Sequence, residues 1–139
     1  MEATQPTMAQ RVAQAARDFQ RDRTGHVPKA VTVVLSNDTL VITLHEALTP
    51  AERALANTAA GAAKVQEYHR QLFITSAEKL REEIKRITGV AVREAAAEVE
   101  TSTGTVVQVF TSGTMVQVFQ LAEGISAETW NGSASLKAS

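Results

Sequence analysis

The chain has 139 residues, a length typical of one domain, and its 14 basic and 15 acidic residues leave a formal net charge of −1. This balance argues against a general affinity for nucleic acid, and aromatic residues at 4% are too few for base-stacking platforms. The absence of Cys excludes disulfides and thiolate metal sites.

Two kinds of membrane or export signal are missing from the sequence. The first residues lack the basic and apolar regions of a signal peptide, and no stretch approaches the roughly 18 consecutive apolar residues of a membrane helix. We therefore expect a cytoplasmic protein that does not insert directly into the membrane.

The first predicted element is a helix over residues 7–22. Thr7 and Gln10 have the spacing of a capping box, and apolar residues follow at helical intervals. Gly25 and Pro28 then indicate a loop, because these two residues interrupt regular structure.

A β-hairpin is predicted next. Residues 30–35 and 40–45 are short runs rich in β-branched residues, separated by the Ser-Asn-Asp-Thr segment at 36–39. Such a polar segment is typical of a tight turn between two strands.

The clearest helix start in the sequence lies at Thr49. Its hydroxyl can cap the helix, Pro50 suits the first helical position, and Glu52 can reach back to the cap. The helical pattern continues to Thr88, where Gly89 suits the left-handed residue that ends a helix.

An unbroken helix of this length would measure about 58 Å, which exceeds the dimensions of a compact domain of this size. The sequence therefore predicts either a break near residues 57–61 or a helix that projects and pairs with a second chain. We favour a long helix, kinked at residues 57–61, that contributes to a homodimer.

Strands are predicted after residue 89. Residues 90–101 mix strand and helix formers, and we predict a strand there because β-rich runs follow. Residues 104–110 are nearly repeated at 113–119, which predicts a hairpin that turns at 111–113. The alternative is a duplication that adds an edge strand, whose uncharged edge could pair with another chain.

Together these elements predict an α+β fold of order α-β-β-α-β-β, with a further strand as an option. Its antiparallel sheet of two hairpins would carry the N-terminal helix and one long central helix on one face. We assign residues 1–121 to this single domain. Residues 122–139 are mostly small and polar, which predicts a flexible C-terminal tail around Trp130.

Several local marks occur in a fixed order along this fold. They are Gly25-His26-Val27-Pro28-Lys29, Leu48-Thr49-Pro50-Ala51-Glu52, Gly61, Thr88-Gly89-Val90 and Thr103-Gly104. With these marks, residues 10–110 resemble the MpsC family. The chain departs from the family pattern at His26 and Val27, where glycines are usual, and it continues beyond the usual end.

The resemblance implies the small soluble component of a bacterial Na⁺-translocating membrane-potential-generating system. It implies two partners: a membrane subunit related to ion-translocating complex I subunits, and a large soluble zinc protein. Related systems take up dissolved inorganic carbon such as bicarbonate. It also implies a position at the inner face of the membrane, held there through these partners.

The residues give little support for catalysis. The three histidines lack metal-ligand spacing, and the sequence contains neither a nucleophile elbow nor a phosphate-binding loop. We therefore predict no catalytic residue, no metal and no cofactor. The predicted function is that of a non-enzymatic accessory subunit; the alternative is a small-ligand or nucleic-acid-binding regulatory module on the same fold.

Two sets of residues are candidates for binding. Positive charge around the predicted loop could receive an anion or an acidic partner surface, although Asp18 and Asp22 partly cancel it; these residues are Arg21, Arg23, His26 and Lys29. The candidate dimer interface consists of His69, Phe73, Leu80, Ile84, Val116 and Val118. At a dimer interface, His69 would make association pH-dependent.

Overall fold

The computed structural model describes residues 5–96, 107–109 and 113–132. Its elements in chain order are α1 (Met8–Thr24), β1 (Ala30–Ser36), β2 (Thr39–His45), α2 (Pro50–Leu55), α3 (Ala59–Thr88), β3 (Val92–Ala96), β4 (Val107–Val109), β5 (Met115–Leu121) and α4 (Ala127–Trp130). This order confirms the predicted α+β class.

The strands form one antiparallel sheet of order β1-β2-β5-β3, with β4 also paired to β5. β3 pairs with residues 118–121 of β5 and β4 pairs with residues 115–117, so the two short strands follow each other along one edge of β5. The sheet is therefore four strands wide, and β1 forms its other edge.

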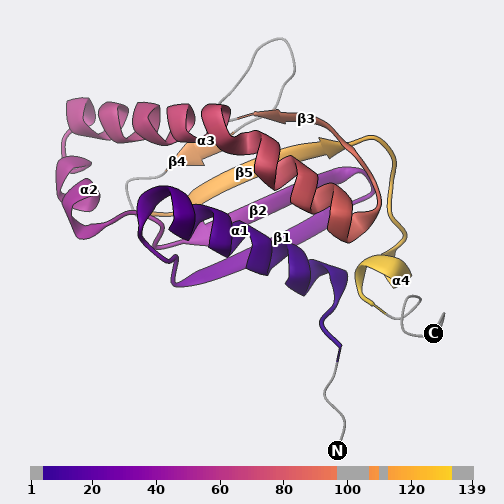
Figure 1. The fold of residues 1–139 in the computed structure, drawn as a ribbon. Helices are drawn as coiled ribbons and strands as arrows, with labels where there is room; N and C mark the ends of the chain where they lie inside the picture. The colour runs from indigo at the N-terminus through magenta and orange to yellow at the C-terminus, as the bar shows by residue number, and fades with distance from the viewer. Residues whose placement is uncertain (1–4, 97–106, 110–112, 133–139) are drawn as a thin grey trace, which may run out of the picture.

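Both long helices, α1 and α3, lie on the same face of this sheet (Figure 1). Alternate residues of β2 and β5 are buried beneath them, as the period of two in a strand requires. Phe73 of α3 and Phe119 of β5 meet in the core with their ring centroids 5.8 Å apart. The predicted arrangement of helices on one face is confirmed.

The first hairpin turns through Asn37 and Asp38, and Asn37 adopts a left-handed φ of 57° that this residue type tolerates. The second hairpin is formed by the internal repeat, because β4 and β5 pair with each other. β5 is an interior strand, since β2 covers one side of it and β3 with β4 covers the other, and the uncharged β4 lies at the edge of the sheet.

The predicted single long helix is divided in two. α2 ends at Leu55, and α3 begins after Thr58, whose hydroxyl accepts a hydrogen bond from the Gly61 N–H at 3.0 Å. At residue 61 the backbone passes so close to Leu55 that a Cβ would lie 1.8 Å from the Leu55 carbonyl oxygen. The expectation of one kinked rod is thus corrected to two helices separated by residues 56–58.

Residues 122–132, which the sequence assigns to a flexible tail, pack on the domain in this structure. The Ala122 N–H donates to the Ala91 carbonyl at 2.8 Å, and the Ile125 N–H donates to the Asn37 carbonyl at 3.2 Å. α4 follows, and its Trp130 is only 7% exposed and belongs to the core. Residues 133–139 of the predicted tail lie outside the described part.

Candidate functional site

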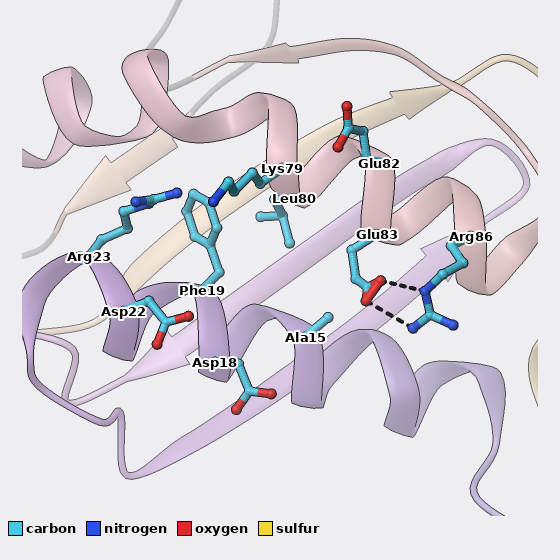
Figure 2. Close-up of a pocket in the computed structure, with 10 residues that line it drawn as sticks. All are labelled: Ala15, Asp18, Phe19, Asp22, Arg23, Lys79, Leu80, Glu82, Glu83 and Arg86. Carbon is cyan, nitrogen blue, oxygen red and sulfur yellow. Dashed lines mark hydrogen bonds and ion pairs between the residues drawn. The ribbon is translucent and has the colours of Figure 1, made fainter.

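A groove of about 540 Å³ lies between α1 and α3 (Figure 2). Its floor is apolar and is formed by Ala15, Phe19 and Leu80. Its rims carry charges of both signs, and these side chains are Asp18, Asp22, Arg23, Lys79, Glu82, Glu83 and Arg86. Because the two signs nearly balance, the groove does not select for a ligand of one charge.

A second region, which we call the loop end, lies at the end of the molecule where α1 ends and α2 begins. α1 stops at Gly25, which has the left-handed φ of 76° typical of a helix C-terminus. The ring Nε2 of His26 then donates to the Glu46 carbonyl at 2.9 Å, and Lys29 Nζ lies 3.4 Å from the Glu46 carboxylate. Two residues from the loop therefore converge on one residue after β2.

Glu46 has an unusual backbone conformation, with a φ of 52° that L-residues rarely adopt. It lines an open cleft of about 330 Å³ together with His26, Leu48, Pro50 and Arg53. A strained backbone conformation costs free energy that the rest of the fold must offset. Such residues are found mainly at active sites and binding sites.

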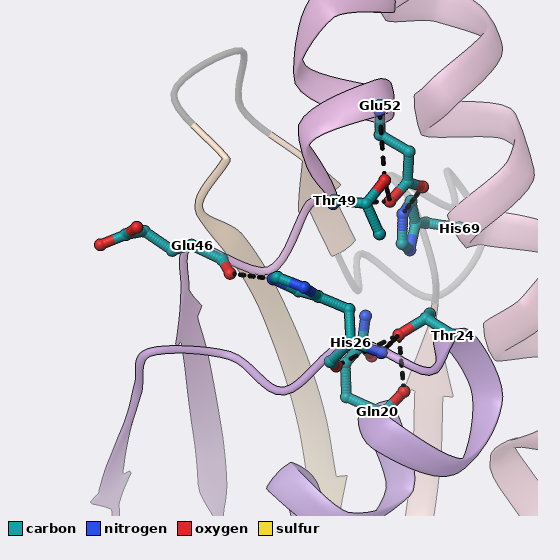
Figure 3. A network of polar contacts seen from close by, with 7 residues as sticks. All are labelled: Gln20, Thr24, His26, Glu46, Thr49, Glu52 and His69. Carbon is teal, nitrogen blue, oxygen red and sulfur yellow. Dashed lines mark hydrogen bonds and ion pairs between the residues drawn. The ribbon is translucent and has the colours of Figure 1, made fainter.

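Behind this cleft, Glu52 of α2 and His69 of α3 point toward each other (Figure 3). His69 Nε2 donates to Glu52 Oε2 at 2.7 Å, and the two side chains are 2% and 17% exposed. The other oxygen of Glu52 accepts the Thr49 N–H at 2.9 Å and the Thr49 hydroxyl at 3.0 Å. One carboxylate thus caps α2 and also fixes α2 to α3.

These contacts determine the ionisation of Glu52. Burial raises its pKa, but the hydrogen bond from the Thr49 backbone, the attraction and hydrogen bond of His69 and the Thr49 hydroxyl together hold the pKa below its usual value. The carboxylate is therefore ionised at neutral pH.

Glu52 also lines a second open cleft, of about 320 Å³, next to the first. Its wall includes the half-exposed side chains of Leu55 and Tyr68. This end of the molecule therefore combines apolar surface with basic and acidic groups, a composition suited to contact with another protein.

A small cavity of about 10 Å³ lies between α1, α3 and β5. It is lined in part by Gln20, Arg23, His69 and Gln117. Within the described residues, Gln20 Nε2, Arg23 Nε and Gln117 Oε1 are buried without a hydrogen-bond partner. The volume is close to that of one water, so the cavity is too small for a larger ligand.

Each histidine ring has its own partner in this chain. His45 Nε2 lies 3.0 Å from the Thr32 hydroxyl, while His26 and His69 make the contacts given above. In residues 5–96, 107–109 and 113–132, no group of three or more His, Asp or Glu side chains could hold a metal ion. Within the same ranges, none of the helices has the length and apolar character needed to cross a bilayer.

Comparison with protein families decides the membership of the chain. The model of the family described as "Na+-translocating membrane potential-generating system (MpsC)" matches residues 4–113, most of the 139 residues. The chain belongs to the MpsC family. No curated protein and no solved structure matches it significantly.

In this MpsC-family chain the four predicted loop charges contact different partners. His26 and Lys29 converge on Glu46. Arg21 instead lies 3.5 Å from Asp18 and 3.4 Å from Asp22 on the surface of α1, and the guanidinium of Arg23 lies over the Phe19 ring at 5.3 Å.

The structure also separates the six predicted interface residues. His69, Phe73, Leu80 and Ile84 are buried in the core of a single copy, so they present no surface to a second copy. Their stripe on α3 is apolar because it faces the sheet. Val116 and Val118 of β5 are only partly buried and lie on the opposite face of the sheet.

Three features of the MpsC-family site were missed from the sequence. They are the contact of Glu52 with His69, the conformation of Glu46 and the buried amides of Gln20 and Gln117. His69 and Gln117 are polar residues at positions where the periodicity of their helix or strand places apolar side chains. This mismatch was the sequence signal for a buried polar contact. Nothing local in the sequence indicates the conformation of Glu46.

Proposed function

We propose that this MpsC-family chain is a non-enzymatic accessory subunit of a Na⁺-translocating membrane-potential-generating system. The observation that carries the proposal is the family match over residues 4–113, whose description names such a system. The proposed partners are a membrane subunit related to ion-translocating complex I subunits and a large soluble zinc protein. The subunit would reach the inner face of the membrane by binding them.

The site supports binding in preference to chemistry. The ionisable side chains at the loop end make contacts inside the chain: Glu52 with His69, and Lys29 with Glu46. The two clefts beside them are open, and Leu55 and Tyr68 expose apolar surface there. We assign partner contact to this end of the molecule.

Affinity purification of the full chain from membranes solubilised in mild detergent tests the proposal. We expect a multi-span membrane protein of the complex I-like type to be recovered in near-stoichiometric amount. Lys29→Glu should reduce that recovery because Lys29 is exposed at the proposed contact, whereas Lys85→Glu, on an exposed residue near the C-terminal end of α3, should not. Recovery of RNA or an anionic metabolite instead would favour the alternative of a regulatory binding module and overturn the proposal.

A further inference from the structure

The face of the sheet opposite the helices carries two rows of small side chains. Residues paired across antiparallel strands project to the same face, so Val34, Val41 and Val118 form one row across β1, β2 and β5. The neighbouring row consists of Thr32, Thr43 and Val116. We call these six residues the open-face patch.

The open-face patch differs from the rest of the molecule in charge. β1, β2, β4 and β5 contain no Asp, Glu, Lys or Arg, although such residues make up 21% of the chain. The solvated face of an antiparallel sheet normally carries polar and charged side chains. Here Val34 is 55% exposed. No helix of the described part lies on this face of the sheet (Figure 1).

The absence of charge favours a second copy of this chain as the occupant. Two copies related by a two-fold axis present the same patch to each other, and an uncharged patch meets its own image without repulsion. A strongly acidic or basic partner would find no complementary charge there. Valine and threonine rows also suit the close packing of two sheets at about 10 Å.

The size of the face sets the strength expected for such a dimer. The three seven-residue strands β1, β2 and β5, about 4.8 Å apart, cover roughly 340 Å² as a flat projection, or about 690 Å² for two copies. Stable interfaces bury about 1,200 Å² or more, and smaller ones are usually weak or transient. An interface of this area therefore fits a weak, reversible association.

We propose that two copies of this chain associate through the open-face patch, sheet against sheet, as a reversible dimer. This inference does not depend on the proposed transport role, because it concerns the isolated chain. Of the residues that the sequence suggested for a dimer interface, this proposal keeps Val116 and Val118 of β5 and omits those of α3.

Sedimentation velocity of the full chain from about 1 to 300 μM tests the proposal, because this range spans the expected dissociation constant. Val34→Lys places a charge in the patch, and Ile74→Lys makes the same kind of change on α3 at nearly the same exposure, 55% against 54%. We expect a wild-type dimer in the micromolar range, at least tenfold weaker with Val34→Lys and within twofold of wild type with Ile74→Lys.

Thr32→Lys, at an exposed position in the neighbouring row, repeats the test, and thermal melts establish that each variant is folded. A wild-type chain that stays monomeric at 300 μM would overturn the proposal. So would a dimer that survives both Val34→Lys and Thr32→Lys, or one that Ile74→Lys dissociates equally well.

Discussion

His69 Nε2 donates a hydrogen bond to Glu52 Oε2 at 2.7 Å, and this contact joins the two helices that replace the single rod expected from the sequence. The same carboxylate caps α2 through Thr49. Because both side chains are largely removed from water, the contact fixes the angle between α2 and α3. The loop end, with its two clefts, is built on that angle.

A double-mutant cycle with Glu52→Gln and His69→Gln should give a coupling energy of about 1–2 kcal/mol, because neighbouring buried groups in one network are not additive. Urea unfolding of the four proteins measures it. The matched control is the Glu83–Arg86 pair, which is exposed on α3 with a 2.6 Å contact and should show no measurable coupling. Equal coupling in the two pairs would contradict a special role for His69.

The stability of the chain should fall in acid partly through Glu52. Its folded-state pKa is below the ordinary value of 4.5, so its contribution is fully present above about pH 4.5 and is lost as the pH falls through the lower folded value. Urea unfolding between pH 7 and about pH 2 should therefore show a smaller acid-induced loss in Glu52→Gln than in wild type.

Glu67 and Glu83 also have lowered pKa values, through hydrogen bonds from Arg70 and Arg86. Both groups are exposed, so salt should screen their contribution and leave that of Glu52 largely intact. Salt at about 0.5 M strongly screens exposed charges. If it abolished the acid-induced loss of stability, that result would argue against Glu52 as the source of the loss.

Gly61→Ala should destabilise the chain by about 2–3 kcal/mol, because the new Cβ would lie 1.8 Å from the Leu55 carbonyl oxygen. In an ordinary helix the same change would stabilise by about 1 kcal/mol. Ala63→Gly, at an exposed position two residues later in α3, is the control and should cost about 1 kcal/mol. Thermal unfolding that shows a more stable Gly61→Ala variant would mean that the helix continues through residues 56–58.

Trp130→Ala should cost about 3 kcal/mol, because the indole is 7% exposed and packs in the core. Tyr68→Ala removes an aromatic ring that is 49% exposed and should change stability by less than about 0.5 kcal/mol. Trp130 is the single tryptophan, so its fluorescence should shift to the red on unfolding. Emission at the unfolded wavelength in the native protein would show that the segment around Trp130 is not docked.

Much of the fold could be predicted because its signals are local. Thr49 with Glu52 formed the capping box that their spacing indicates, and Asn37 turned the first hairpin. The sequence located a possible break after Leu55 but did not distinguish a break from a kink. The distinction depends on the close approach of the backbone at Gly61 to Leu55, which no local pattern predicts.

The sheet order and the site were less accessible, because they depend on contacts between distant residues. The pairing of β2 with β5 and the contact of Glu52 with His69 join segments that no local pattern relates. Of the four basic residues grouped by the sequence, His26 and Lys29 share a contact with Glu46, whereas Arg21 and Arg23 contact residues of α1.

The central claim, that the chain serves a sodium-dependent membrane-potential system, is tested most directly in membrane vesicles. Vesicles from cells that lack the chain are compared with those to which the purified chain is added back, using a potential-sensitive dye and a sodium gradient. We predict a reduced sodium-dependent potential that wild-type chain restores and the Lys29→Glu variant does not. An unchanged potential in vesicles without the chain would contradict the account.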